Sequence, residues 1–212
     1  MNGTWMVALV AGALLGGAAT PRLTAQGLAQ LARVDAARPG LALASAVAGG
    51  GAGAAAIVTS HRADTWWLVP ALLVWGSALV AAASCDAVTQ RIPTALVRQA
   101  AVGTGVLLTA GLAVHGDWRS LLISGVAAAA AGSVLLLCWR FAGAGFGDVR
   151  LAVLGGLGLG HTTQLGLIVA VAVFALITLV QAVVTLARGG DRHATFPYGP
   201  GLAISFLLAA AL

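Results

Sequence analysis

Long apolar runs, separated by short stretches that contain Pro, Gly, Arg or Asp, follow one another along the whole chain. A membrane-spanning helix needs about 20 mostly apolar residues, and such polar or helix-breaking stretches separate one span from the next. The pattern predicts eight apolar segments: 4–20, 41–58, 66–84, 95–114, 121–139, 149–160, 164–187 and 201–212. We therefore expect an all-α, polytopic transmembrane helix bundle that forms a single integral membrane domain over residues 1–212.

Two of these segments, 149–160 and 201–212, are 12 residues long, which is too short to cross a bilayer unaided. Composition strengthens the membrane assignment, because the 212 residues are 60% hydrophobic and only 8% charged. The mean hydropathy of +0.99 lies above the range of ordinary soluble domains. Almost nothing remains from which a soluble domain could be built.

The longest polar stretch, residues 21–40, allows two interpretations. Leu28, Leu31 and Val34 are spaced to form a short interfacial helix, which would point Arg33 and Arg38 toward lipid headgroups. An irregular loop is the alternative. The Gly- and Ala-rich stretch 46–56 is more informative about packing, since small residues let membrane helices approach closely.

The basic residues are all arginines, and their distribution predicts the orientation of the chain. A sequence pI near 11 would suggest nucleic-acid binding in a soluble protein, but these arginines lie in or beside short loops between apolar segments. Cytoplasmic loops carry an excess of Lys and Arg. Loops after odd-numbered segments hold Arg22, Arg33, Arg38, Arg91, Arg98, Arg140, Arg150, Arg188 and Arg192, and the other side holds Arg62 and Arg119. We therefore expect a multi-pass protein of the inner (cytoplasmic) membrane, with both termini outside, contacting lipid and no nucleic acid.

Two of the six aspartates stand apart from the others. Asp86 and Asp148 each adjoin an apolar segment on the predicted cytoplasmic side, whereas Asp35, Asp64, Asp117 and Asp191 lie in polar loops. An ionisable side chain at membrane depth is costly and usually functional, although the cost is smaller at a helix end. Position alone therefore leaves the role of this pair open.

The residues around Asp148 suggest how its carboxyl group is positioned. Gly145, Gly147 and Asp148 form a G-x-G-D sequence within GAGFGDVRL. Glycines lack a Cβ atom and allow another backbone to come close, and an Asp at a helix start is favoured by free N–H groups. Alone, this pattern is more typical of a Gly-rich helix start with an ordinary Asp N-cap.

The residues around Asp86 form a second element, SCDAVTQRIPTAL. Asp86 ends an apolar segment, and Ile92 and Pro93 follow just before the next one. Proline at a helix start is common. This element too is weak in isolation.

Together with a third element before the last segment, these sequences resemble the prepilin peptidases (type IV leader peptidases), which are membrane aspartyl proteases of the GxGD type. Members of that family carry an aspartate followed seven residues later by the Pro of an I-P-N-x-L type element, then G-x-G-D-x-K-L, then P-F-G-P. The matching residues here are Asp86, Ile92, Pro93 and Leu96, then Gly145, Gly147, Asp148, Arg150 and Leu151, then Pro197, Tyr198, Gly199 and Pro200.

The resemblance covers about residues 66–212, a peptidase-like core, and leaves the two segments in 1–65 without a motif. Thr94, Arg150 and Tyr198 stand where the family often has Asn, Lys and Phe. The chain also lacks the N-terminal C-x-x-C insert that larger bacterial members carry and that is associated with methylation. It is therefore similar to a short form of the family.

The resemblance implies an aspartic endopeptidase with Asp86 and Asp148 as its catalytic pair. Its substrates would be prepilin or pseudopilin precursors, which have a short basic leader, commonly ending in Gly, before an apolar helix. Cleavage would occur at the cytoplasmic face of the membrane. The mechanism implied needs no metal and no cofactor.

Two other functions remain open from the sequence. A small transporter would also place Asp residues in a helical bundle, but we find no convincing internal repeat of the kind that transporters show. A non-catalytic membrane component of a pilus or secretion machine could share the fold. Such an inactive relative would be expected to have lost one of the two aspartates, and both are present.

Overall fold

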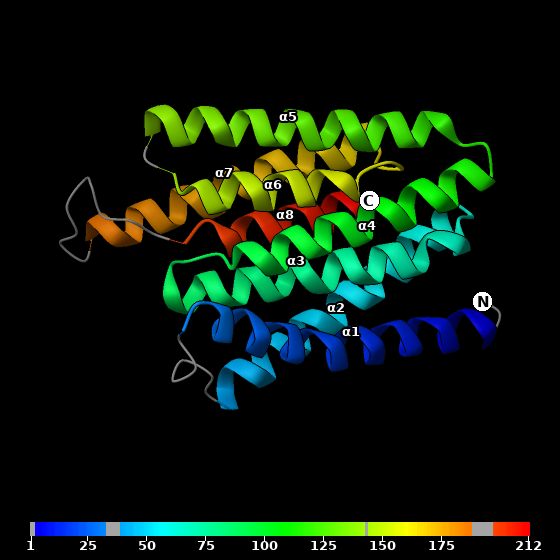
Figure 1. Cartoon of the computed structure of the whole chain (residues 1–212), viewed down its shortest axis with the longest axis horizontal. Coiled ribbons are helices and arrows are strands. Elements are labelled where there is room, and N and C mark those ends of the chain that lie inside the picture. The colour runs from blue at the N-terminus through cyan, green and yellow to red at the C-terminus, as the bar shows by residue number, and fades with distance from the viewer. Residues whose placement is uncertain (1–2, 33–38, 143, 188–196) are drawn as a thin grey trace.

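The computed structural model describes residues 3–32, 39–142, 144–187 and 197–212, and within these ranges the regular structure is entirely helical (Figure 1). This confirms the expected all-α bundle. A short 3-10 helix, η2 (Trp66–Leu68), leads into the third of the α-helices. These are α1 (Gly3–Gln30), α2 (Pro39–Arg62), α3 (Val69–Thr89), α4 (Thr94–Val114), α5 (Trp118–Ala142), α6 (Phe146–Leu157), α7 (Gln164–Ala187) and α8 (Gly199–Ala211).

Six of these helices, α1 to α5 and α7, are long and apolar enough to cross a membrane. The protein is therefore a multi-pass membrane protein. The other two, α6 and α8, have 12 and 13 residues and correspond to the two short segments that the sequence predicts. Both pack inside the bundle, where α6 and α8 lie between α5 and α3 (Figure 1).

The centre of the bundle is formed by α3 and the two short helices. The indole N–H of Trp75 on α3 donates a hydrogen bond to the carbonyl oxygen of Leu154 on α6 at 2.9 Å. Glycines of α6 and of the turn after it allow close approaches. A Cβ atom built on Gly155 would overlap the ring of Phe206, and one on Gly158 would overlap the ring of Trp75. Gly156 abuts the backbone of Ala128 in the same way.

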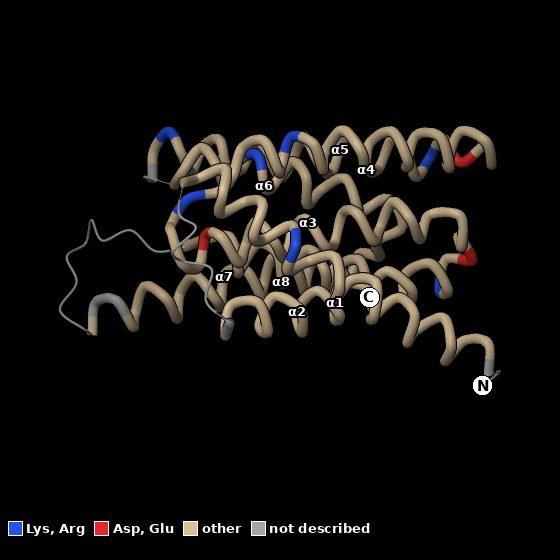
Figure 2. Tube along the Cα trace, turned by 60° about the horizontal axis from the view of Figure 1, so that its bottom comes forward, with Lys and Arg blue, Asp and Glu red and all other residues tan. Residues whose placement is uncertain are grey.

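Successive helices alternate in direction, so α3 ends, α4 begins, α5 ends and α6 begins at the same end of the bundle (Figure 1). We call this the Asp86 end; α7 also ends there and α8 begins there. Arginines concentrate toward it (Figure 2). Arg91, Arg98, Arg140 and Arg150 lie at helix ends or turns there, and Arg62 and Arg119 lie at the opposite end. Arg33, Arg38, Arg188, Arg192, Asp35 and Asp191 lie outside the described residues.

The opposite end carries stacked aromatic rings. Trp5 stacks on His61 with ring centroids 4.3 Å apart, and Trp67 stacks on His115 at 3.8 Å. Tryptophans are enriched where membrane helices meet the headgroup region. This ring cluster is consistent with a membrane interface at that end.

The first helix is longer than the sequence pattern predicts. We expected it to end near residue 20, with a short helix or loop after Pro21, but α1 continues through Pro21 to Gln30. Proline removes only one intrahelical hydrogen bond, and membrane helices tolerate it where neighbouring helices support the chain. That support is present, since Leu28 is buried and the thiol of Cys85 on α3 donates to the carbonyl oxygen of Thr24.

The third helix also extends beyond its apolar run. The expected segment stopped at residue 84, whereas α3 continues to Thr89 and is ended by Gln90 in the left-handed conformation. The Gln90 N–H donates to the carbonyl oxygen of Asp86 at 2.8 Å, which closes the last turn. Asp86 therefore lies within the final turn of a helix.

Candidate active site

Asp86 is buried near the C-terminal end of α3, where a negative charge is unfavourable. The start of α8 stabilises the carboxyl group of Asp86. Its side chain is 5% exposed, and a carboxylate near a helix C-terminus faces the negative end of the helix dipole. The backbone N–H of Gly199, the first residue of α8, donates to Asp86 Oδ2 at 2.8 Å. The positive end of α8 thus binds the carboxyl group that α3 supplies.

Asp148 lies in the first turn of α6 and is 6% exposed. Its Oδ2 atom accepts a hydrogen bond from the N–H of Gly145 at 2.9 Å, so the carboxyl group closes the start of its own helix. Burial, and then the negative charge of Asp86, raise the pKa of Asp148 to about 6. The helices that carry the two aspartates, α3 and α6, contact each other.

Contacts between the turn after α3 and the start of α6 bring the two aspartates together. A Cβ atom on Gly147 would lie 3.0 Å from the Cβ of Ile92. Arg150, one turn further along α6, donates from Nη1 to the hydroxyl of Thr94 at 2.6 Å. The residues that follow Asp86 are thus held against those that flank Asp148.

This geometry changes our interpretation of the two glycines. We expected them to admit another backbone, but the group that approaches Gly147 is the side chain of Ile92. Gly145 faces the carboxyl group of Asp148, with a built Cβ 3.1 Å from Oδ2. Gly147 therefore allows close packing of Ile92, and Gly145 leaves room for the carboxyl group that caps α6.

The element before the last helix reaches Asp86 through Gly199. A Cβ atom at this position would lie 2.8 Å from Asp86 Oδ2 and 2.9 Å from its Cβ. Pro200 follows in the first turn of α8, where a missing N–H costs no helical hydrogen bond. The carbonyl oxygen of Pro197 accepts a hydrogen bond from Gln181 on α7 at 3.2 Å. Burial, and then the charges of Asp148 and Cys138, raise the pKa of Tyr198.

Pro93 precedes α4 as its N-cap and is almost fully buried. It packs against a residue that the sequence analysis did not single out, because a Cβ atom on Gly27 of α1 would lie 3.0 Å from the Pro93 ring and 2.8 Å from Cys85 Sγ. Gln30 Oε1 accepts the N–H of Leu96 at 3.1 Å and so caps the start of α4. The end of α1 therefore supports the turn that carries Ile92 and Pro93.

A signal for this support is present in the sequence. Gly16, Thr20, Thr24 and Gly27 are small residues at helical spacing, and they continue the pattern of the first segment across Pro21. They lie outside the three sequence elements discussed above, so an interpretation guided by those elements passes over them. Cys85, next to Asp86, is fully buried, and its Sγ donates to the carbonyl oxygen of Thr24 at 3.5 Å.

The arrangement provides two buried carboxyl groups at the same end of the bundle, each held through Oδ2 by one backbone N–H. Within the described ranges neither carboxyl group has another hydrogen-bond partner. Such a pair can share one proton, and it can activate a water molecule between its members. Comparison with known protein families, with curated proteins and with solved structures finds no match for this chain.

Proposed function

We propose that this protein is a membrane-embedded aspartic endopeptidase that removes the short leader from type IV prepilin-like precursors. The observation that carries the proposal is the convergence of Asp86 and Asp148, both buried, from the end of α3 and the start of α6. The resemblance of residues 66–212 to prepilin peptidases provides the substrate class.

The chemistry follows from the electrostatics of the pair. Two neighbouring carboxyl groups in a poorly hydrated site cannot both ionise cheaply, so one keeps a proton. The ionised member takes a proton from a water molecule as that water attacks the scissile carbonyl carbon. The protonated member donates toward the carbonyl oxygen, in the manner of other aspartic proteases. The carboxyl group that took the proton from water then passes it to the leaving nitrogen, the other carboxylate recovers its proton from the hydroxyl group, and the peptide C–N bond breaks.

The proposed orientation places the Asp86 end in the cytoplasm. The support is the concentration of arginines at that end, since cytoplasmic loops are rich in basic residues (Figure 2). A precursor whose apolar helix lies in the inner membrane would present the junction between leader and helix at the same depth. A prepilin or pseudopilin is therefore the partner we propose, with lipid around the bundle.

The decisive experiment replaces each aspartate by asparagine in protein reconstituted with a precursor. Asparagine keeps the size of the side chain but neither accepts the proton of the water nor shares one. Asp86→Asn and Asp148→Asn should each lower the cleavage rate by roughly 10²–10⁴, and the double variant should lose little more because the pair acts as a unit.

Matched controls come from the opposite end of the bundle. Asp64→Asn and Asp117→Asn should cleave at the wild-type rate, since Asp64 is exposed in a turn and Asp117 caps α5, a role that asparagine also fills. Near-normal cleavage by Asp86→Asn or Asp148→Asn at equal membrane levels would contradict the catalytic role of the aspartate pair. Failure of the wild-type protein to cleave any precursor would instead favour a transporter or a non-catalytic component of a pilus or secretion machine.

A further inference from the structure

A groove of about 480 Å³ opens on the side of the bundle between α2, α3 and α8. Its lining contains no charged residue, and most of its side chains are small. On α2 the lining runs from Leu41 to Ala55, which at 1.5 Å per residue is about 21 Å, or four helical turns. The groove is therefore long enough to seat a substantial part of another membrane helix.

One end of the groove adjoins the aspartate pair. Ala83 and Ala87 line it from α3, and Ala83 lies one helical turn before Asp86 on the same side of the helix. From α8 the lining begins at Pro200, the residue after Gly199, whose N–H binds Asp86. One end of the groove therefore lies next to the residues that hold Asp86.

The chemistry of α2 suits a helix as the occupant. Its Gly49 and Gly53 already pack closely against α1, because Cβ atoms built on these residues would overlap backbone oxygens of Gly16 and Gly12. Toward the groove, α2 presents Ala44, Ala48 and Gly51 in a second row of small, exposed residues. Small rows of this kind let membrane helices approach backbone to backbone.

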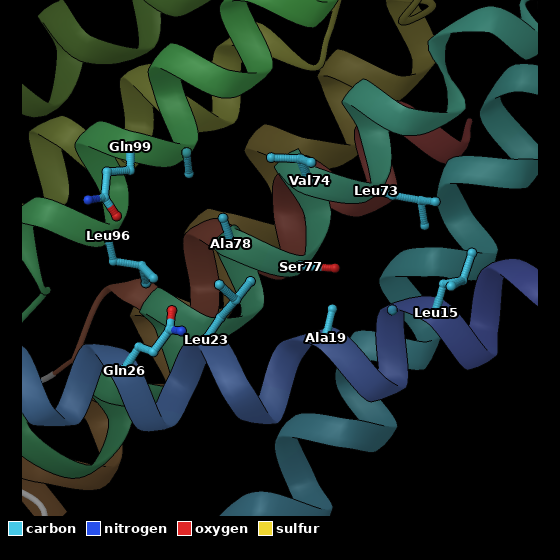
Figure 3. A pocket seen from close by; sticks show the side chains of 12 residues that line it. Leu15, Ala19, Leu23, Gln26, Leu73, Val74, Ser77, Ala78, Leu96 and Gln99 are labelled. Carbon is cyan, nitrogen blue, oxygen red and sulfur yellow. The ribbon is translucent and has the colours of Figure 1, made fainter.

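A second groove of about 410 Å³, between α1, α3 and α4, does not have this relation to the site (Figure 3). Its lining from α3 includes Ser77 and Ala78. Asp86 follows Ser77 by about two and a half helical turns and therefore faces the opposite side of α3. Of these two grooves, the one beside α8 is the one whose lining includes a sequence neighbour of Gly199.

We propose that the apolar helix of a leader-bearing precursor docks in the groove between α2, α3 and α8, which delivers the bond to be cleaved to Asp86 and Asp148. This inference rests on the proposed endopeptidase function. It assigns substrate recognition to α2, which carries none of the family motifs. It also gives α8 two roles, since its first turn binds Asp86 and its side forms a wall of the groove.

The test compares two glycines, each on a membrane helix with open space around it. A Cβ atom on Gly51 of α2 or on Gly125 of α5 would meet nothing within 4 Å, so a side chain can leave the backbone at both positions without a clash. The substrate is a model precursor in phospholipid vesicles, with a lysine-containing leader that ends in Gly, followed by an apolar helix of about 20 residues. Gly51→Leu should lower kcat/KM by roughly tenfold because it fills the groove, and Gly125→Leu should not change it.

Photo-crosslinking tests occupancy directly and independently of catalysis. A benzophenone amino acid replaces Ala48, which lines the groove, or Val126, which is 67% exposed on α5, in the Asp148→Asn background. We expect an adduct with the precursor from position 48 and none from position 126. Adducts from position 48 with lipid only, or with a second copy of the chain, would overturn the docking site.

The two proposals fail in distinguishable ways. Wild-type cleavage that Gly51→Leu leaves unchanged would overturn the docking site and leave the endopeptidase standing. If the wild type does not cleave the precursor, both proposals fall.

Discussion

Gly199 lies so close to Asp86 that it cannot carry a side chain without moving the carboxyl group. Alanine at this position would bring a methyl group to 2.8 Å from Asp86 Oδ2 while leaving the backbone N–H in place. A displacement of about 1 Å in a catalytic group can cost roughly 100-fold in rate. We therefore expect Gly199→Ala to lower cleavage by about that factor, as measured in vesicles. Gly105→Ala, with nothing within 4 Å, is the matched control and should cleave normally.

The raised pKa of Asp148 predicts how stability depends on pH. In the folded protein this pKa is about 6, above its usual value of 3.8, so the folded state is progressively destabilised as pH rises from about 4 to 6. Asparagine does not titrate and still accepts the N–H of Gly145. Asp148→Asn should therefore raise the thermal unfolding temperature in detergent by a few degrees above pH 6.

This gain should disappear below about pH 4, as the wild-type carboxyl group becomes protonated in the unfolded as well as in the folded state. A variant that is equally stable or less stable than the wild type at neutral pH would contradict the burial of an ionisable pair. The measurement is independent of any substrate, so it tests the site and not the reaction.

The sequence identifies Asp86 and Asp148 as candidates because a carboxyl group beside an apolar run is unusual. It does not reveal their hydrogen-bond partners. Gly199 follows Asp86 by more than a hundred residues, and the contact exists only because α8 begins at the same end of the bundle as α3 finishes. The sequence identifies Gly147 as a point of close approach, but it does not reveal that Ile92 occupies the space.

Among the elements, α1 has the clearest structural influence on the site. Its Gly27 lies against Cys85 and Pro93, which flank the turn after Asp86. Gly27→Val would insert two branched methyl groups there, and overpacking of this kind costs about 1–3 kcal/mol. We expect a lower unfolding temperature together with slower cleavage, because the displaced turn carries Ile92 away from Gly147.

The control for this prediction lies two residues earlier on the same helix. Ala25→Val changes an exposed position of α1 and should leave both the unfolding temperature and cleavage near the wild-type values. If Gly27→Val behaved like Ala25→Val, the last turns of α1 would have no part in supporting the site.

Helix number and order could be predicted from hydrophobicity, because apolar runs in a membrane protein correspond closely to helices. Helix ends could not. Proline and charged residues suggest a break at Pro21 and after Ser84, yet α1 and α3 both continue, since contacts with other helices stabilise their polar last turns. Hydrogen bonds such as that from Leu96 to Gln30 link distant segments and leave no periodic pattern in the sequence.

For the whole molecule, the orientation in the membrane is the property most open to test. Single cysteines replace Val114, 81% exposed at the end of α4, and Phe141, 77% exposed near the end of α5. The background carries Cys138→Ser, and the remaining Cys85 is fully buried. An impermeant thiol reagent on intact cells should label position 114, and position 141 only after the membrane is permeabilised. The reverse pattern would place the Asp86 end outside and contradict a cytoplasmic site.

The glycines that let α6 pack at the centre of the bundle also limit which missense mutations the gene can accept. Every missense mutation of a glycine codon adds at least one carbon atom. Gly155, Gly156 and Gly158 already touch Phe206, Ala128 and Trp75 without space for one. A substitution at Gly155 or Gly158 is therefore tolerated only if the facing ring of Phe206 or Trp75 has first been replaced by a smaller side chain. At Gly156 no such replacement exists, because the nearest facing atoms belong to the backbone of Ala128. Codons 155, 156 and 158 should consequently lose almost all their variants when the gene is randomised under selection, while those for Gly105 and Gly125 accept many.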